Sequence, residues 1–426
     1  MTDSPLFIGL DVGTSGARAI AVDRARAIVA QGAARMADFG DDHRSPDIWW
    51  AAATRALATI LAAIPAQSVR AIAVDGTSGT MLPVDGAGTP LTQPLMYNDP
   101  VADPALVQAV GDAAPATSAA HGATSGLAKT LAFQDVPGAV RVIHQADWIA
   151  GRLSGRFDVS DENNALKTGY DPVVRCWPDW LEAAGARRAM LPEVLAPGTP
   201  VGRITEEAAA EFGLPGETIL VTGTTDGCAS FLATGAAEIG DAVTALGSTL
   251  TVKMLCDRPI FAPEYGVYSH RFGDRWLAGG ASNTGGNVLA AFFTPDELAA
   301  LSERIDAASD SGLDYYPLLK KGERFPVNDP ELAPRLEPRP ADDAAFLQAL
   351  FEGMAAVEAL GYRRLAELGA PPLASLRTVG GGARNPQWAE IRARKLGVPF
   401  RESRSEEAAA GTAFLALEGA EKAGLA

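Results

Sequence analysis

Five turns rich in glycine, serine and threonine, each following an apolar β-type segment, constrain the fold of this chain more than any other feature. The first lies in Ile8–Asp23 (IGLDVGTSGARAIAVD). The others lie in Val74–Asp85 (VDGTSGTMLPVD), Val221–Ser230 (VTGTTDGCAS), Ala245–Leu255 (ALGSTLTVKML) and Arg377–Asn385 (RTVGGGARN). Such turns let the backbone approach a bulky anion and offer N–H and hydroxyl donors to phosphate oxygens. Their repetition predicts that they converge on one polyanionic ligand.

The first of these turns is expected to close a β-hairpin, because apolar runs flank it on both sides. Asp11 ends the first strand, where a carboxylate could hold a divalent cation against phosphate oxygens. Val74–Asp85 has the same form and predicts a strand, a turn and a second strand. Taken alone, each segment is also compatible with an ordinary turn.

Length and composition limit the class of protein. A chain of 426 residues exceeds one ordinary core, so two domains are expected. The net charge of −16 argues against nucleic acid or an anionic membrane as partner. No apolar run is long enough to predict a membrane span. Three well-separated cysteines and an N-terminus without a basic region predict a cytoplasmic protein with reduced thiols.

Strands alternate with helices along the chain and predict an α/β protein with mixed sheets. Ser45 and Pro46 are expected to start a helix as N-cap and first-turn proline. Further helices are predicted over residues 139–154, 342–368 and 405–423, and a polar loop over residues 160–169. The segment from Ser375 to Phe400 predicts strand, glycine turn, helix with Pro386 in its first turn, and strand.

Asp226 is the most informative single residue. It follows two threonines and precedes Gly227, Cys228 and Ala229 at a predicted strand-to-helix corner. The residue is equally compatible with an N-cap and with a base that accepts the proton of an attacking hydroxyl. Asp75 has a similar dual interpretation, as a turn residue or as a carboxylate that binds a hydroxyl.

Several common catalytic signatures are missing from the sequence. There is no G-x-x-x-x-G-K-[ST] P-loop and no G-x-S-x-G nucleophile elbow. Asp38-Phe39-Gly40 spells DFG, but no HRD segment accompanies it, so we interpret it as a loop. The four histidines have no metal-ligand spacing. Lys253 and Arg384 are candidate phosphate contacts, although solvated basic residues would have the same pattern.

The order of these segments resembles the FGGY carbohydrate kinases. The resemblance rests on IGLDVGTSGARAIAVD, VTGTTDGCASFLATG, ALGSTLTVK and, above all, VGGGARNPQWAEIRARKLGVPF with EEAAAGTAFLA. It implies two ribonuclease-H-like domains of the actin and sugar-kinase ATPase type with a cleft between them. The sugar domain would comprise residues 1–233 and the ATP domain residues 234–405. A C-terminal helix at about residues 406–426 would pack back on the first domain.

The resemblance also implies roles for individual residues. Asp226 would be the catalytic base, and Asp11 would act beside it, both near a Mg²⁺ ion. ATP would contact three turns, made of Gly13, Thr14 and Ser15, of Gly247, Ser248 and Thr249, and of Gly380, Gly381, Gly382, Ala383 and Asn385. The sugar would contact Asp75, Ser15, Gly16 and Asp226.

Departures from the family pattern bear on the substrate. Xylulose kinases of the family carry Gly-Gln-Met-His-Gly where this chain has Asp75–Gly79. The family's W-x-D-x-R is Tyr97–Val101 here and lacks the arginine. SHRFGDRWLAGGASNTGG and YYPLLKKGERFPVNDP resemble a compact subgroup of D-ribulose kinases, so we expect phosphorylation of D-ribulose at its 5-hydroxyl. A kinase for another ketose or polyol, such as xylulose, and an inactive sugar- or ATP-binding protein remain alternatives. We expect a monomer or homodimer with no nucleic-acid or membrane partner.

Overall fold

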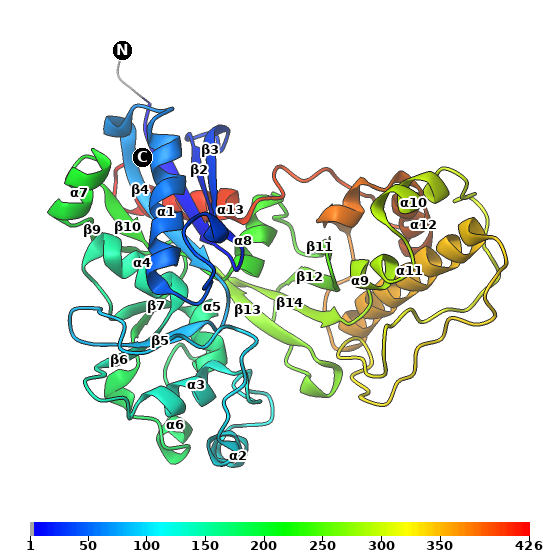
Figure 1. Cartoon of the computed structure of the whole chain (residues 1–426), viewed down its shortest axis with the longest axis horizontal. Coiled ribbons are helices and arrows are strands. Elements are labelled where there is room, and N and C mark those ends of the chain that lie inside the picture. Colours follow the sequence, from blue (N-terminus) through cyan, green and yellow to red (C-terminus); the bar gives the residue numbers. More distant parts are fainter. Residues whose placement is uncertain (1–3) are drawn as a thin grey trace. The chain divides into compact units, whose positions relative to one another are not determined.

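The computed structural model describes residues 4–426 and divides into two compact units. Unit 1 contains the described residues up to Ala233 together with Glu407–Ala426, and unit 2 is Thr234–Glu406. Each unit has its own sheet and its own helices (Figure 1). The last helix therefore belongs to the same unit as the first strand, although unit 2 separates them in the sequence.

Unit 1 is built on a six-stranded sheet with strand order β3-β2-β1-β4-β10-β9. Strands β1, β2 and β3 form an antiparallel meander, whereas β4 pairs in parallel with β1 and β10 in parallel with β4. The strands are β1 Leu6–Val12, β2 Gly16–Val22, β3 Ile28–Arg35, β4 Val69–Gly76, β9 Pro200–Arg203 and β10 Ile219–Val221. The hairpin predicted at the N-terminus is confirmed as β1 and β2.

Alternation along β1 assigns one set of side chains to each face of this sheet. Leu6, Ile8 and Leu10 pack in one core with helix α1 (Pro46–Leu61) and helix α4 (Gln145–Ser154). Phe7 points the other way and packs with helix α13 (Ala408–Lys422). Asp11 has the parity of Phe7, so the pleat directs its side chain to the α13 face. The predicted start of α1, with Pro46 in its first turn, is confirmed.

The rest of unit 1 differs from the sequence predictions in three places. Residues 139–154 are not one helix, because β6 (Arg141–His144) pairs with β5 (Met81–Val84) before α4 begins. Val74–Asp85 contains the predicted strand, turn and strand, but β4 and β5 do not pair with each other, because they belong to different sheets. Residues 160–169 are mostly buried and contain α5 (Glu162–Ala165) and a 3-10 turn at Leu166–Thr168. The remaining elements are α2 Pro104–Ala113, α3 Gly126–Phe133, β7 Val159–Asp161, α6 Trp180–Ala183, β8 Glu193–Leu195, α7 Glu206–Phe212 and α8 Asp226–Ala233.

Unit 2 repeats the central topology of unit 1. Its five-stranded sheet has the order β13-β14-β12-β11-β15, with β11 and β12 antiparallel and β15 parallel to β11. The strands β12-β11-β15 thus match β2-β1-β4 of unit 1. In both units a hairpin and a following parallel strand form the common nucleus. The strands are β11 Asp241–Leu246, β12 Leu250–Cys256, β13 Tyr268–Phe272, β14 Arg275–Ser282 and β15 Ser375–Val379.

Helix α11 (Asp343–Glu367) organises the core of unit 2. It is the one helix among residues 4–426 that is long and apolar enough to cross a membrane, and 83% of its most apolar window is buried inside the protein. Phe346, Leu350 and Met354 project from it into the core. The other helices are α9 Gly286–Ala290, α10 Pro295–Ser302 and α12 Pro386–Leu396, which starts at Pro386 as predicted. Val398–Phe400 forms only an isolated bridge with Leu376 and not the predicted strand.

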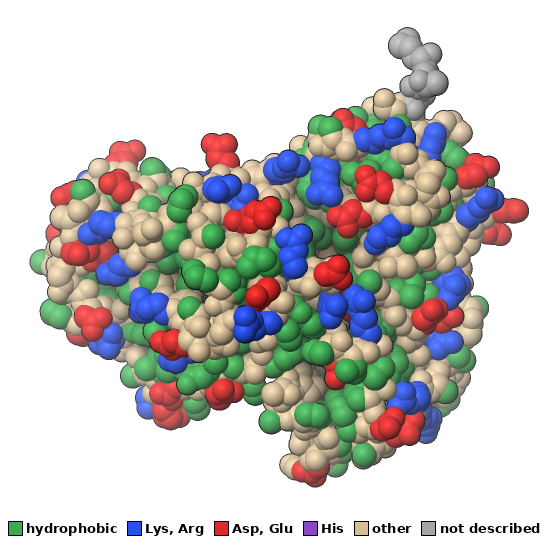
Figure 2. Space-filling view, turned by 180° about the vertical axis from the view of Figure 1, so that it is seen from behind, with side chains coloured by type: hydrophobic (Ala, Val, Ile, Leu, Met, Phe, Trp, Pro, Cys, Tyr) green, Lys and Arg blue, Asp and Glu red, His purple; other side chains and the backbone are tan. Residues whose placement is uncertain are grey.

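Charged side chains of both signs are interspersed over the face of the molecule shown in Figure 2. No broad basic area is visible on that face, which agrees with the net charge of −16.

A buried ion pair connects α11, α12 and the sheet of unit 2. Arg392 donates to Glu358 through Nε at 2.6 Å and Nη2 at 2.7 Å, and both side chains are almost fully buried. Thr244 on β11 donates to the same carboxylate at 2.5 Å, and Arg392 also donates to Thr378 on β15 at 2.9 Å. The network satisfies the buried charges and fixes both helices against neighbouring strands.

We expect Glu358→Ala to lower the free energy of unfolding by about 3–5 kcal/mol, because it leaves the Arg392 guanidinium buried without a carboxylate. The double variant Glu358→Leu/Arg392→Met should be less destabilised, because neither charge remains. Urea unfolding of the single and double variants measures both values. A double variant as unstable as the single one would contradict this account.

Candidate functional site

Three aspartates meet at the carboxyl ends of the central strands of unit 1. Asp11 and Asp75 are directly paired across the parallel strands β1 and β4. The next residue of β4, Gly76, forms a bridge with Thr225, which places the end of the β10 segment beside them. Asp226 follows as the first residue of α8 and is partly exposed. Strand register and one strand-to-helix corner thus gather residues far apart in the sequence.

Asp75 is enclosed at the back of this group. Its side chain is fully buried, and Thr412 of α13 donates a hydrogen bond to its Oδ2. Its Oδ1 is buried and has no hydrogen-bond partner among the described residues. Because its side chain is fully buried, Asp75 has no exposed atom that could contact a sugar. The structure therefore does not show the direct sugar contact expected of Asp75. Asp75 instead lies against Asp11.

The carboxylates perturb one another. Burial raises the pKa of Asp11 to about 6, and the nearby Asp226 charge adds to the rise, while a hydrogen bond with Asp75 and the charge of Arg18 oppose it. Burial, followed by the charge of Asp11, raises the pKa of Asp75 well above its ordinary value. Packing carboxylates this closely is costly unless protons or a cation neutralise them. The hard carboxylate oxygens of Asp11 and Asp226 fit a magnesium ion, which takes one or two carboxylates together with phosphate oxygens.

The turn between β1 and β2 presents its side chains to solvent next to Asp11. Gly13 N donates to Gly16 O at 3.0 Å, and the Thr14 and Ser15 side chains are exposed. Gly16 has a packing role as well, because a Cβ there would lie 2.5 Å from the Ala34 carbonyl oxygen on β3. Glycine at this position therefore follows from strand packing, independently of the expected sugar contact.

Two lysines near this site were not singled out from the sequence. Lys129 on α3 is fully buried and donates to the backbone oxygens of Gly79 and Met96 at 2.7 and 2.6 Å. Burial lowers its pKa to about 8. Lys167 reaches the backbone oxygen of Ser78 at 3.5 Å. In the sequence, a single lysine in a helical or polar segment looks like an ordinary solvated residue. Only the folded surroundings show that these two lysines are buried or partly buried.

Unit 2 contains a cavity of about 470 Å³ whose surface is largely apolar. Of the residues predicted to bind ATP, Gly247, Ser248, Gly381, Gly382 and Asn385 line it. Thr249, Gly380 and Ala383 are close in the sequence but do not line it. The other lining residues are Leu246, Gly286, Asn287, Leu289, Ala290, Phe293, Thr294, Pro295, Leu298, Phe351 and Trp388.

The apolar wall of this cavity comes from two helices. Phe351 of α11 stacks on Trp388 of α12 with ring centroids 4.9 Å apart and planes 6° from parallel. Gly382 lies so close that a Cβ there would be 2.5 Å from the Trp388 ring. A pocket with aromatic walls and a few polar groups at its edge suits a flat ligand such as a nucleobase. Helical spacing is the only sequence pattern that includes these two aromatic residues, so their place at a cavity could not be predicted.

The turn between β11 and β12 forms one edge of the cavity. Gly247 O accepts from Gly286 N at 2.9 Å, and Ser248 O accepts from Asn287 N at 3.0 Å. These bonds attach the turn to the start of α9, while the Ser248 side chain is left at the surface.

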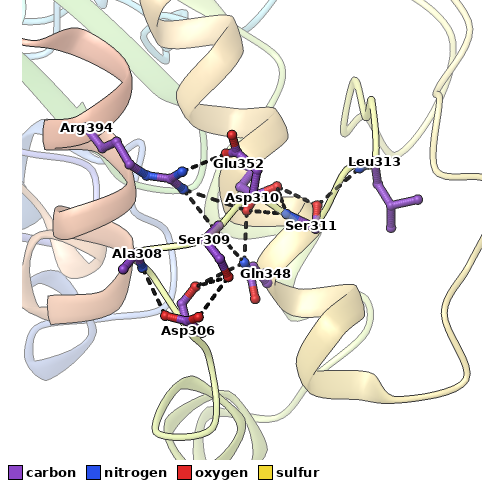
Figure 3. A network of polar contacts seen from close by, with 9 residues as sticks. All are labelled: Asp306, Ala308, Ser309, Asp310, Ser311, Leu313, Gln348, Glu352 and Arg394. Atoms are coloured by element: carbon purple, nitrogen blue, oxygen red, sulfur yellow. Dashed lines mark hydrogen bonds and ion pairs between the residues drawn. The ribbon is translucent and has the colours of Figure 1, made fainter.

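A polar network joins residues 306–313, which follow α10 in the sequence, to helices α11 and α12 (Figure 3). Arg394 of α12 donates to Asp310 Oδ1 at 2.8 Å. Glu352 of α11 accepts from Ser311 N at 3.0 Å and from Gln348 Nε2 at 3.0 Å. The segment that follows α10 is therefore fixed to both helices that supply the aromatic wall.

Asn385 joins the same elements from the cavity side. Its Oδ1 caps α12 by accepting from Trp388 N at 2.9 Å, and its Nδ2 donates to Ser302 Oγ, at the end of α10, at 2.7 Å. The geometry explains why an asparagine stands here, since it needs both an acceptor and a donor.

Asp11 should make unfolding depend on pH. Because its pKa is raised in the folded state, its stabilising contribution is complete below the ordinary value near 3.8 and is lost as pH rises through about 6. Without Mg²⁺ or nucleotide, Asp11→Asn should therefore unfold with a free energy about 1–3 kcal/mol above wild type at pH 7.5. The gain should shrink toward pH 4.5.

Urea unfolding at pH 4.5 and 7.5 tests this, with the exposed Asp274→Asn as matched control. An Asp11→Asn variant that differs from wild type equally at both pH values would refute the account.

The comparisons with known proteins agree with this architecture. The N-terminal domain of the FGGY family of carbohydrate kinases matches residues 6–108, and its C-terminal domain matches residues 242–420. An autoinducer-2 kinase of Yersinia enterocolitica is 30% identical over 296 residues, covering 62% of this chain and 54% of that protein. The chain thus spans about half the length of the curated relatives it matches.

Solved structures share the fold over nearly the whole chain. A "xyloylose kinase" from Brucella ovis has a TM-score of 0.86 at 24% identity and covers 98% of this chain and 91% of its own. A xylulose kinase from Rhodospirillum rubrum has a TM-score of 0.82 at 23% identity, covering 97% and 90%. The predicted fold, with two domains of the actin and sugar-kinase ATPase type, is confirmed. With both domains matched in order, the chain belongs to the FGGY family of carbohydrate kinases.

Proposed function

We propose that this protein transfers the γ-phosphoryl group of ATP to a ketopentose, with D-ribulose as substrate and D-ribulose 5-phosphate as product. The observation that carries the proposal is the meeting of Asp11, Asp75 and Asp226 at adjacent strand ends of unit 1. The aromatic-walled cavity of unit 2 supports a nucleotide as the second substrate. The reaction uses residues of both units.

In this mechanism Asp226 is the base. Its partly exposed carboxylate accepts the proton of the 5-hydroxyl, and the oxygen forms a bond to the γ-phosphorus of ATP. The bond from that phosphorus to the bridging oxygen breaks, and its electron pair leaves with ADP. No covalent enzyme intermediate is needed, so catalysis comes from positioning and from neutralising charge.

Asp11 and Asp226 would hold a Mg²⁺ ion that travels with ATP. Residues 4–426 contain no cluster of three or more histidine, cysteine or acidic ligands suited to a resident metal. Magnesium needs few protein ligands when phosphate oxygens complete its shell. When bound, it neutralises charge on the phosphates. The buried Asp75 and its bond from Thr412 keep Asp11 in position.

The choice of D-ribulose rests on the resemblance of residues 269–286 and 315–330 to a compact ribulose kinase subgroup, and on the departures at Asp75–Gly79 and Tyr97–Val101. The relatives favour a second candidate, since their names describe kinases of autoinducer-2 and of xylulose. ADP release measured with D-ribulose, L-ribulose, D-xylulose, L-xylulose, ribitol, glycerol and autoinducer-2 separates them. A response to a different sugar would keep the kinase and discard D-ribulose.

We expect Asp226→Asn to lower kcat for sugar phosphorylation by about 10²–10⁴-fold, because the amide cannot accept the hydroxyl proton. ATP affinity should change little, since the nucleobase cavity lies in unit 2. Steady-state kinetics and calorimetric titration of ATP measure the two effects. Glu206→Ala, the exposed acidic first residue of α7 in the same unit, is the matched control. Unchanged turnover in Asp226→Asn would remove the base from the mechanism.

The nucleotide cavity can be tested by filling it. Ala290 lines the cavity and is exposed, whereas its neighbour Ala291 is exposed but does not line it. Ala290→Trp should weaken ATP binding by about tenfold or more, because the indole occupies the volume of the base. Ala291→Trp should bind ATP like wild type. Equal affinity in the two variants, measured by calorimetry, would place the nucleotide elsewhere.

A further inference from the structure

Two lysines converge on the loop at residues 76–80, and their hydrogen bonding differs. Lys129 is firmly held, because its buried ammonium donates two short hydrogen bonds, to Gly79 O and Met96 O at 2.7 and 2.6 Å. These bonds hold the loop at residues 76–80 against the segment that contains Met96.

Lys167 is held differently. Its ammonium has three donors, yet its one hydrogen bond to the described residues is long, at 3.5 Å to Ser78 O. No ion pair includes it within residues 4–426, and the side chain is only partly exposed. Its stem packs toward Gly79, where a Cβ would lie 3.8 Å from Lys167 Cδ. A cation that is partly desolvated and weakly bonded has donors left for a ligand.

Lys167 lies near the catalytic carboxylates. Asn163, one helical turn before it, donates through Nδ2 to Thr224 Oγ1 at 2.9 Å, two residues before Asp226. The loop that Lys167 touches starts at Gly76, which forms a bridge with Thr225. The lysine and Asp226 therefore flank one short loop.

The sugar that accepts the phosphoryl group could provide a hydrogen-bond partner for Lys167. In the furanose ring of a 2-ketopentose the 5-oxygen closes the ring, so transfer to that oxygen requires the open chain. The open chain carries a free carbonyl group at carbon 2. That oxygen is a planar acceptor without a proton, whereas the corresponding polyol carries a tetrahedral hydroxyl at carbon 2.

We propose that Lys167 donates a hydrogen bond to the carbonyl oxygen of an open-chain ketose and so makes the protein select ketoses over polyols. The inference rests on the proposed function and deepens it. Lys167 is a substrate contact and a specificity determinant, while Asp226 handles the proton at the other end of the sugar. A hydrogen bond from a charged donor to a buried acceptor gives discrimination of about tenfold or more.

The test compares ketose and polyol pairs, D-ribulose with ribitol and D-xylulose with xylitol. In Lys167→Met, which keeps an unbranched apolar side chain, the ketose-to-polyol ratio of kcat/KM should fall about tenfold or more. The loss should come from KM for the ketose, with KM for ATP and kcat/KM for the polyol within about twofold of wild type. Lys167→Arg should recover part of the ratio. The exposed Lys320→Met is the matched control.

A merely structural role would lower kcat/KM for ketose and polyol equally, and that result would overturn the proposal. Calorimetric binding of each sugar without ATP separates the inference from the proposed function. Ketose binding that depends on Lys167, in a protein that phosphorylates no sugar, would refute the kinase activity and uphold the contact. Sugar phosphorylation with an unchanged ketose-to-polyol ratio of kcat/KM in Lys167→Met would uphold the kinase activity and refute the contact. Absence of both ketose binding and phosphorylation would refute both.

Discussion

The close packing of α13 against the sheet of unit 1 determines the geometry of the acidic group formed by Asp11, Asp75 and Asp226. A Cβ on Gly9 would lie 2.0 Å from the Ala409 carbonyl oxygen, and one on Gly411 would lie 2.0 Å from the Ala229 carbonyl oxygen. Only glycine allows these approaches of backbone to backbone. They bring Thr412 within hydrogen-bonding distance of Asp75 and seat α13 against α8, whose first residue is Asp226. The positions of the three carboxylates therefore depend on the close backbone contacts at Gly9 and Gly411.

The two units differ in the nature of the groups that they bury. Unit 1 concentrates charge, since three aspartates and two lysines lie around the ends of its central strands. Unit 2 offers a largely apolar cavity with backbone groups at its edge. A shared hairpin-and-parallel-strand nucleus supports both, which shows how little the scaffold itself determines the chemistry. The difference comes from what the turns and covering helices place at the strand ends.

Local signals predicted the features that depend on neighbours in the sequence. The N-terminal hairpin, the start of α1 at Pro46 and the strand–turn–helix around Pro386 follow from turn chemistry and proline geometry. Features that depend on distant contacts were missed. Residues 141–144 form a strand instead of the predicted helix, because β5 pairs with them. The polar segment after Ser160 is buried because its members bond to one another and to Thr224, which composition alone does not reveal.

The position of α13 has a consequence for synthesis of the protein on the ribosome. Unit 2 is one uninterrupted stretch and can become compact as soon as Glu406 has emerged. Unit 1 must wait, because Thr412 and the glycine contacts of α13 are translated only after the whole of unit 2. The nascent chain thus passes through a stage in which the strands bearing Asp11 and Asp75 exist while the apolar α13 face of their sheet, including Phe7, is uncovered. Protection of that face by a chaperone, or rapid translation of unit 2 and α13, becomes part of how this site is made.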